Sequence, residues 1–543
     1  MESFSIASVF SDYMVIQRNK NTAIFGKADS GAVIKAELFN LKNDLLCSNI
    51  TTSHNGSWLL YLPSQSTQTE CTLNISCQNQ TISFSHIAIG EVWLAGGQSN
   101  MEFELQNCTE GPEELKSDKA GKNIRFYYTN KIAWKDENFY KAEKNTRWQT
   151  WESPAKGAWS AVAYFFAKQL SKDLDCTVGI IGCNWGGTSA SAWMRKEFLE
   201  KDEELKSYLS EYEEAVKGKS IEQQIKEYDA YEIEYNKWQE KYSKLWEQQP
   251  GITWEQAEKT LGKNPWPGPK SCKNPFRPTG LYDCMLSRII PYTLKGILWY
   301  QGESDDHKPA SYYKLFSSMI DNWRTDWNDQ TMPFIFVQLP VHRYEADKDF
   351  KHWCLIREAQ AKTAATIKNT WLTCAFDLGQ FSDIHPKAKK LVGERMEKNA
   401  LSHIYNKIPA EQSDAPRFTD FIILNDDNEK PGRIILNFEN AEDGFEIHND
   451  DIRLQEYRKM EETQNTPLPR DFTGFEIAGP DGIFYPAVFT FETQSGRQNQ
   501  ITLYSDKVKD PVSARYGWFN YGPVTIYGKN GLPLCPFRTN SIS

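Results

Sequence analysis

Short apolar runs alternate with amphipathic stretches over the middle of the chain, from about residue 86 to about residue 410. The apolar runs predict buried strands at Ile87–Leu94, Thr177–Cys183, Gly296–Tyr300, Phe334–Leu339 and Trp371–Phe376. The amphipathic stretches predict helices at Ser160–Leu174, His352–Ile367 and Pro386–Tyr405, the last opening on a proline in its first turn. Nearly continuous apolar strands separated by helices predict an α/β fold with a parallel sheet and helices on both faces.

The first 85 residues are rich in short β runs instead. These runs lie at Val15–Gln17, Thr22–Gly26 and Val33–Leu38 and are bounded by Gly, Asn and Asp. Asn55 and Gly56 precede the apolar run Trp58–Leu62, and Asn-Gly supplies the two positive φ angles of a type I′ hairpin turn. This segment therefore predicts a small β-sandwich.

Two other segments depart from the alternating pattern. Residues from about 195 to 275 are rich in Glu, Lys and Tyr at helical spacing and end in the proline-rich stretch Asn264–Pro269. They predict a charged helical insertion, with a lid over a functional site as the alternative. Beyond about residue 410 short β runs return between Gly, Asp and Asn turns and predict a second β-sandwich. The predicted domains are 1–85, 86–410 with the insertion, and 411–543.

Polar segments, three of them rich in glycine or amide residues, follow four of the predicted central strands. They are Gly96–Ser99, Asn184–Thr188, Gln301–Ser304 and, after the last strand, Asp377 with Asp383–Pro386. Open parallel sheets bind ligands beyond the carboxyl ends of their strands. We therefore expect these four segments to form one site at one edge of the sheet.

The side chains in these segments predict nucleophilic catalysis. Ser99 is the candidate nucleophile and His385 its general base. Asp383, the nearest carboxylate in sequence, would fix the imidazole tautomer and stabilise the imidazolium. The oxyanion of a tetrahedral intermediate needs fixed donors, and the candidates are the N–H groups of Ser99 and Gly187 and the side-chain amide of Gln301. Together they predict acyl transfer to water, the reaction of an esterase.

Two other functions use residues of the same region. Glu91 and Glu303 could be the paired carboxylates of a glycoside hydrolase, but Glu91 lies several residues before the end of its strand, which favours a structural role. A non-catalytic carbohydrate-binding scaffold would fit the 18 tryptophans, because an indole packs on the C–H face of a sugar. Gln98, Trp185 and Glu303 are candidate substrate-binding residues.

Composition narrows the set of partners. A net charge of -10 argues against nucleic acid, whose binding relies on basic patches, and no stretch approaches the length of a membrane helix. The 11 cysteines form no C-x-x-C pair and no cluster with histidine, so we expect neither a metal nor another cofactor. Met1–Ser5 leads directly into strand-like sequence, which predicts a cytoplasmic chain, or an exported one whose leader has been removed.

Taken together, the motifs resemble those of the sialate O-acetylesterases, a branch of the SGNH hydrolases. Gly90–Met101 resembles the first motif block of that family, and Trp299–Ser304 resembles the third, where this branch has Gln in place of the Asn of the wider superfamily. The other matching segments are Trp185–Thr188 with Trp193 and Met194, Ile384–Pro386 with Lys390 and Gly393, Val9–Gln17, Ala514–Tyr516 and Pro536–Thr539. The resemblance thus spans nearly the whole chain.

The resemblance implies a flavodoxin-like SGNH hydrolase core flanked by β domains, with no metal. It also implies removal of acetyl groups from a carbohydrate, above all the O-acetyl groups of sialic acids, with acetylated xylan or another plant polysaccharide as the alternative. It makes Ser99 the nucleophile and His385 the base, with oxyanion donors at Ser99, Gly187 and Gln301.

The position of the acid departs from the pattern of the wider superfamily. There the acid lies three residues before the histidine, where this chain has Ser382. Asp383 lies two residues before His385 and is our candidate, with Asp377 in reserve. A serine–histidine dyad oriented by a backbone carbonyl is the third possibility.

Overall fold

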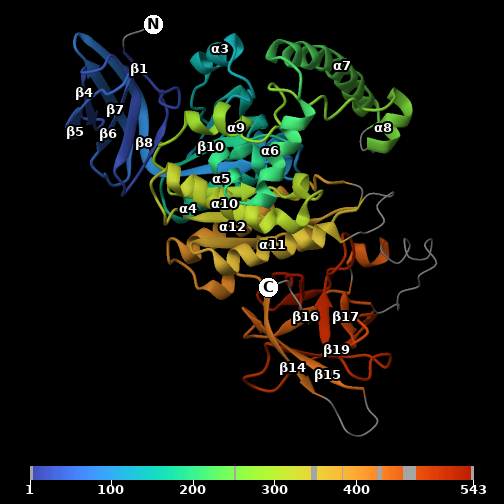
Figure 1. Cartoon of the computed structure of the whole chain (residues 1–543). Coiled ribbons are helices and arrows are strands. Elements are labelled where there is room, and N and C mark those ends of the chain that lie inside the picture. The colour runs from blue at the N-terminus through green and yellow to red at the C-terminus, as the bar shows by residue number, and fades with distance from the viewer. Residues whose placement is uncertain are drawn as a thin grey trace. The chain divides into compact units, whose positions relative to one another are not determined.

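The computed structural model describes residues 4–249, 252, 254–343, 351–381, 383–424, 431–449, 451–456 and 472–539. The chain forms two compact units (Figure 1). The first comprises Met1–Ser304 and Lys314–Phe334, and the second comprises Asp305–Tyr313 and Ile335–Ser543. The architecture is mixed α/β, as the sequence predicts, with several β-sheets and helices.

The first unit contains the predicted buried parallel strands. Strand β8 (Gln80–Gly97) pairs in parallel with β10 (Val178–Asn184) on one side and with β11 (Gly296–Tyr300) on the other, and β9 (Ile124–Tyr128) extends the sheet beyond β10. Every residue of β10 and β11 is buried. Strands β10 and β11 match the predicted bounds closely, because their continuous apolar runs are buried on both faces. Strand β8 begins before the predicted Ile87 and ends after the predicted Leu94, and β9 was not predicted.

Helices cover both faces of this sheet. Trp93 of β8 packs against Phe166 of α4 (Ala161–Asp173), whereas Trp299 of β11 packs against Trp323 of α10 (Tyr312–Asp326). Trp299 lies opposite Gly96, three positions beyond Trp93, so the two indoles project from opposite faces.

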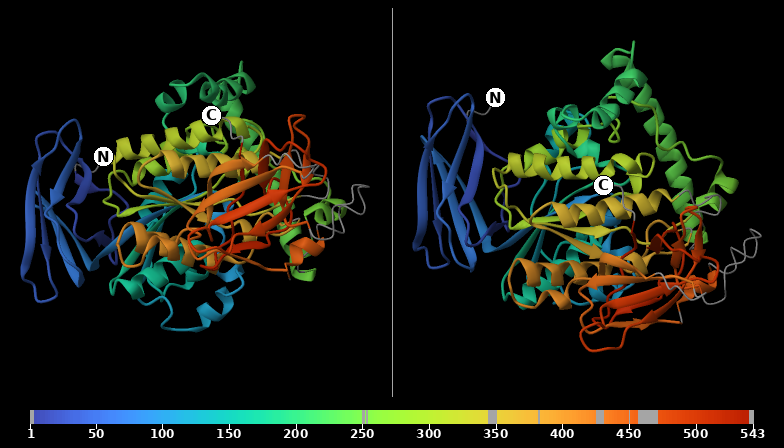
Figure 2. Two further views of the ribbon diagram at one scale, coloured as in Figure 1. Left: turned by 90° about the horizontal axis from the view of Figure 1, so that it is seen from below. Right: turned by 60° about the horizontal axis from the view of Figure 1, so that its bottom comes forward.

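The N-terminal strands form two sheets. One contains β1 (Phe4–Ile6), β3 (Thr22–Ala28) and β6 (Ser57–Leu62), and the other joins β5 (Leu45–Thr52), β4 (Val33–Phe39) and β7 (Gln68–Cys77) to the first half of β8. The short β2 (Val15–Gln17) also pairs with β8. Because β8 runs through both the antiparallel and the parallel sheet, it connects the two parts covalently. Figure 2 shows these strands, in blue, standing to one side of the parallel sheet.

The predicted turn at Asn55 and Gly56 is present, but the strands that flank it do not pair as a hairpin. Both residues have positive φ, +50° and +80°, as a type I′ turn requires. However, β5 pairs with β4 and β6 pairs with β3, so only His54 and Ser57 bridge across the turn. The turn therefore carries the chain from one sheet to the other.

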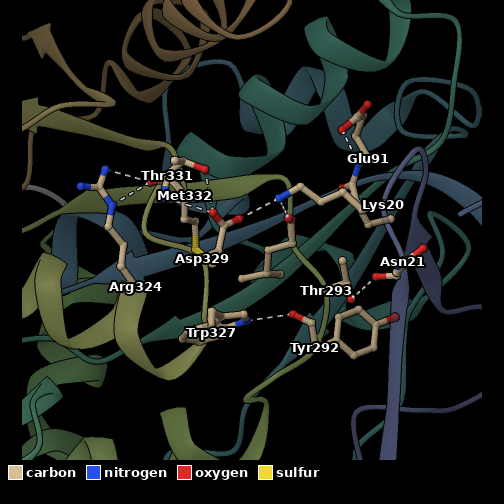
Figure 3. Close-up of polar contacts among 12 residues, drawn as sticks. Lys20, Asn21, Glu91, Tyr292, Thr293, Arg324, Trp327, Asp329, Thr331 and Met332 are labelled. Carbon is tan, nitrogen blue, oxygen red and sulfur yellow. Dashed lines mark hydrogen bonds and ion pairs between the residues drawn. The ribbon is translucent and has the colours of Figure 1, made fainter. Parts of the chain in front are cut away.

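Polar contacts hold the β2–β3 connection to the end of α10 (Figure 3). The Lys20 ammonium lies 3.0 Å from Asp329 Oδ2 and donates to the Leu294 carbonyl at 3.1 Å. Thr293 Oγ1 donates to the Asn21 carbonyl and accepts from the Ala23 N–H. Distant parts of the sequence are thus fixed to one another within the first unit.

The predicted helical insertion is present. It contains α5 (Lys196–Glu200), α6 (Glu203–Ala215), the long α7 (Ile221–Gln248) and α8 (Trp254–Leu261). Helix α7 begins with a capping box in which Ser220 and Gln223 satisfy each other's backbone N–H groups. Few of its side chains are fully buried, as expected for a charged helix with a solvated face.

The second unit contains the strands β12 (Phe334–Gln338) and β13 (Thr370–Cys374) with helices α11 (His352–Thr366) and α12 (Lys389–His403). Helix α12 begins three residues after Pro386, so the prediction that this proline opens the helix is wrong. The reason is local: the Asp383 side chain accepts the His385 N–H and holds the preceding residues in a turn. Ser382 lies outside the described residues.

Among the described residues, three small sheets complete the second unit and confirm the return of β structure. Their antiparallel strands are β14 (Arg417–Leu424), β15 (Arg433–Glu439), β20 (Gln500–Tyr504) and β19 (Val488–Phe491); β18 (Phe484–Pro486), β17 (Phe475–Ala478), β21 (Ser513–Tyr516) and β23 (Phe537–Arg538); and β16 (Phe445–Ile447) with β22 (Ile526–Gly528). Among the described residues, none of the helices has both the length and the apolar character needed to span a bilayer.

Candidate active site

Three of the four predicted strand-end segments leave the sheet at the same level. In the parallel register, Asn184 of β10 and Tyr300 of β11 both lie opposite Gly97 of β8. The loops that follow these three residues therefore start from one edge of one sheet. They carry Ser99, Gly187 and Gln301, so these three residues follow strand ends at the same edge of the sheet.

Two glycines allow the loops to approach Ser99. Gly97 ends β8 with a φ of +135°, and a Cβ there would lie 2.2 Å from the Tyr300 carbonyl oxygen. Gln98 then donates its N–H to that same carbonyl at 3.0 Å, and the short helix α1 (Ser99–Glu102) begins at the serine. A Cβ on Gly186 would lie 3.2 Å from the Ser99 Cβ. The loop after β10 thus packs directly against the candidate nucleophile.

Glu102 fixes the loop that follows β10. Its Oε2 accepts the Gly186 N–H at 2.7 Å, and its other oxygen pairs with Lys131. Gly187 follows with a φ of +74°. Within the described part of the chain, the Gly187 N–H donates to no protein acceptor. Sequence reasoning missed Glu102, because its partner is 84 positions away in the chain and no local pattern links the two.

The three loops are also tied to one another by buried side chains. Gln301, fully buried, donates from Nε2 to the Thr188 carbonyl at 3.2 Å. Gln98 Oε1 accepts from the Ser304 N–H at 3.1 Å, and Asn100 Nδ2 donates to Glu303 Oε1 at 2.6 Å. These contacts hold the loops in fixed positions.

The three candidate substrate-binding residues differ in their surroundings. Gln98 and Glu303 are buried, and both take part in the contacts between loops, which favours a positioning role. Trp185 is half-buried, and its backbone N–H donates to the Gly97 carbonyl at 3.1 Å. Only the last of the three has substantial surface open to a ligand.

The contacts of Glu91 support its structural interpretation. Its carboxylate accepts from Arg18 Nε at 2.6 Å and from Gln17 Nε2 at 2.9 Å, and its side chain is almost fully buried. It pairs with Val178 at the start of β10, far along β8 from Ser99. A paired-carboxylate site with Glu303 is therefore not formed within this unit.

His385 and both candidate acids belong to the second unit. Asp383 Oδ1 accepts the backbone N–H of His385 at 2.9 Å. Asp377 forms a bidentate pair with Arg395, at 2.6 and 2.7 Å, and accepts from the Tyr527 hydroxyl at 3.3 Å. Asp377 is thus held in an ion pair, whereas Asp383 is fixed beside the histidine backbone.

Comparison with known proteins gives an independent result. Residues 268–402 match the family model described as "Carbohydrate esterase, sialic acid-specific acetylesterase". The sialate O-acetylesterase of Mus musculus is 23% identical over 434 residues, 74% of each chain, and that of Homo sapiens is 23% identical over 432 residues, 74% of this chain and 72% of the relative. This chain is a carbohydrate esterase related to the sialate O-acetylesterases. The family resemblance drawn from the motifs is confirmed.

A solved structure matches the esterase over its whole length. It is a carbohydrate acetylesterase from Xanthomonas citri, with a TM-score of 0.72, 23% sequence identity, and coverage of 99% of this chain and 100% of that one. The likeness shows a shared fold. The segment matched by the family model contains Gln301 and His385, whereas Ser99 and Gly187 precede it.

Two buried tyrosines border the loops of the esterase and stay neutral. Burial raises the pKa of Tyr128, and the nearby Glu102 carboxylate raises it further. Burial likewise raises the pKa of Tyr300, with a further contribution from Glu303. Neither phenol can therefore act as a base near neutral pH. Among the described residues, no group of three or more His, Cys, Asp or Glu side chains is placed to hold a metal ion.

Proposed function

We propose that this esterase hydrolyses acetyl esters of sialic acid through an acetyl-enzyme formed on Ser99. The observation that carries the proposal is the convergence of Ser99, Gly187 and Gln301 at one level of the parallel sheet. The relatives named sialate O-acetylesterase and the family model support sialic acid as the sugar.

The proposal includes the flavodoxin-like SGNH arrangement and the division into 1–85, 86–410 and 411–543. The parallel order β9–β10–β8–β11 with helices on both faces fits such a core. The change of strand partners along β8 and the return of antiparallel strands after α12 support this division. The proposal requires the second unit to bring the His385 imidazole to Ser99.

Chemistry begins with attack of Ser99 Oγ on the acetyl carbonyl carbon, while His385 takes the hydroxyl proton. The carbonyl becomes an oxyanion that accepts from the N–H groups of Ser99 and Gly187 and from the Gln301 amide. The C–O bond to the sugar then breaks, and His385 returns the proton to the departing sugar oxygen. A water molecule, deprotonated by His385, then attacks the carbonyl carbon of the acetyl-Ser99 ester. The bond from that carbon to Ser99 Oγ breaks, His385 returns the proton to Oγ, and acetate leaves.

The structure contributes to this sequence by fixing the donors before the substrate arrives. Glu102 holds Gly186, so the adjacent Gly187 N–H points from a rigid loop. Gln301 is anchored on the Thr188 carbonyl. Preorganised donors of this kind stabilise the developing charge without reorganisation, and losing one typically costs about 10²- to 10³-fold in kcat.

Acetate release from O-acetylated sialic acid, measured beside acetylated xylan, tests the proposed substrate. We expect a higher kcat/KM on the sialic acid ester, and we expect Ser99→Ala to lower turnover on both substrates by at least about 10³-fold. A higher kcat/KM on xylan would contradict the choice of sugar. Release from neither ester would contradict the activity itself.

A further inference from the structure

Aromatic side chains of the helical insertion lie against the loop that carries Gly187. A Cβ placed on Gly187 would be 3.0 Å from Phe276 Cε1 and 3.2 Å from Trp266 Cζ2. The two rings meet edge to face, with centroids 5.6 Å apart. The insertion thus reaches the loop of the proposed oxyanion donor, whereas the sequence predicted a charged helix with a solvated face or, as the alternative, a lid over a functional site.

Trp266 leaves much of its indole open. Trp266 is 49% exposed. Four other tryptophans of the first unit are at most 1% exposed: Trp93, Trp159, Trp193 and Trp299. Exposing a large aromatic surface forgoes the hydrophobic stabilisation that burial gives. An open indole beside a catalytic loop therefore suits a ligand with an apolar face.

The segment that carries Trp266 is held firmly. The side-chain oxygen of the buried Asn264 accepts the backbone N–H of Trp266 at 3.0 Å. The side-chain amide of the buried Asn274 donates to the Pro269 carbonyl at 2.9 Å. Gln224 of α7 accepts the Cys272 N–H at 2.9 Å. The indole is therefore presented from a loop that is anchored to α7.

Helix α7 supports this loop with a row of tyrosines. A Cβ on Gly268 would lie 2.5 Å from the Tyr231 ring, so the phenol packs directly on the loop backbone. Tyr231 stacks on Tyr235, with ring centroids 5.7 Å apart. The tyrosines of α7 thus pack against the loop that carries Trp266.

We propose that Trp266 is a stacking platform for the acetylated sugar, and that the insertion serves to hold it beside Gly187. The proposal rests on the proposed function, because it places the acetyl carbonyl oxygen on the Gly187 N–H. The sugar carbon that bears the acetyl group is two bonds from the carbonyl carbon, so the sugar must lie next to that loop. Its C–H face can then pack on the indole.

Kinetics on two esters test this platform. 4-Nitrophenyl acetate carries the acetyl group without a sugar, whereas an O-acetylated sialic acid carries both. Trp266→Ala should lower kcat/KM on the sugar ester by roughly 3- to 10-fold more than on 4-nitrophenyl acetate. Trp266→Phe, which keeps an aromatic face, should recover part of the loss. Equal losses on both esters, or no loss on either, would overturn the proposal.

Trp246 gives a matched control, because it is 38% exposed and lies on α7 within the same insertion. Trp246→Ala should leave the ratio of the two kcat/KM values unchanged. The same change of ratio in both variants would mean that loss of any exposed tryptophan of the insertion acts indirectly, and it would overturn the assignment to Trp266.

Binding separates this proposal from the proposed catalysis. Saturation-transfer NMR with free sialic acid, the deacetylated product, needs no turnover. Ser99→Ala should keep the transfer to the sugar C–H protons, and Trp266→Ala should lose most of it. If the wild type binds the sugar but releases no acetate, the proposed function fails while the platform stands. If Trp266→Ala binds as the wild type does, the platform fails while the catalysis stands.

Discussion

Ser99 lies where three strand-end loops meet, and individual residues make that meeting possible. Gly97 and Gly186 provide the space, since a side chain at either position would press on the Tyr300 carbonyl or on Ser99 itself. Glu102 and Asn100, both within three residues of Ser99, then bind the neighbouring loops. The surroundings of this candidate nucleophile are thus built largely by its own short segment.

At the scale of single residues, two matched substitutions test which carboxylate orients His385 and stabilises its imidazolium. Asp383→Asn should lower kcat by at least about 10²-fold, because the amide keeps the hydrogen bond to the His385 N–H but loses the charge that stabilises the imidazolium. Asp377→Asn should instead lower the thermal midpoint, because it breaks a buried ion pair with Arg395 that is worth about 3–5 kcal/mol when one partner is removed.

Steady-state kinetics and thermal unfolding of both variants distinguish these outcomes. A kcat near that of the wild type in Asp383→Asn would reject Asp383 as the acid. A larger loss of kcat in Asp377→Asn than in Asp383→Asn would identify Asp377 as the acid that orients His385. If neither variant changes kcat, a dyad oriented by a backbone carbonyl is the remaining arrangement.

At the scale of elements, the sequence predicted the strands better than their partners. Strands β10 and β11 were found, because continuous apolar runs are typical of strands buried on both faces, whereas β9 was missed. The turn at Asn55 and Gly56 was also found, because positive φ has a local chemical signature. Its two strands enter different sheets, however, and that choice depends on contacts with β3 and β4 that no local pattern encodes.

In the candidate site, too, local signals could be predicted from the sequence and contacts between distant segments could not. Ser99, Gly187 and Gln301 could be predicted, because each follows an apolar strand and parallel strands place their carboxyl ends at one edge. The Glu102–Gly186 hydrogen bond and the contact of Trp266 with the Gly187 loop could not be predicted, because both join segments distant in sequence. The start of α12 was misplaced, because the turn at Asp383 outweighs the preference of proline for the first turn of a helix.

At the scale of the whole molecule, the N-terminal strands are held to the parallel sheet by β8 and by polar contacts at Lys20 and Asp329 (Figure 3). Burial opposes ionisation of Asp329, but the hydrogen bonds from Thr331 and Lys20 outweigh it and lower the pKa of this carboxyl. The ionised form is therefore favoured in the folded protein.

This shift predicts a pH-dependent contribution to stability. A carboxyl with a lowered pKa in the folded state stabilises the fold above its unfolded pKa, about 3.9, and loses that contribution as the pH falls through the folded value. Asp329→Asn should thus lower the thermal midpoint at pH 7, by the equivalent of up to about 1 kcal/mol for a partly exposed pair, and the difference from the wild type should shrink below pH 4.

Thermal midpoints of the wild type and the variant between pH 7 and pH 3 measure this difference. Asp321→Asn is a suitable control, because that aspartate is exposed on α10 and its ion pair with Lys201 is 4.0 Å long. A difference between wild type and Asp329→Asn that stays constant or grows as the pH falls would contradict the predicted sign.

The central claim is that Ser99 is the nucleophile of an acetylesterase, and covalent labelling tests it most directly. A fluorophosphonate reacts with serines that are activated by a base, and peptide mass spectrometry locates the adduct. We predict a single adduct on the peptide containing Ser99 in the wild type, with parallel loss of acetate release, and no adduct in Ser99→Ala. Inactivation with the adduct on another serine, and Ser99 unmodified, would contradict the account.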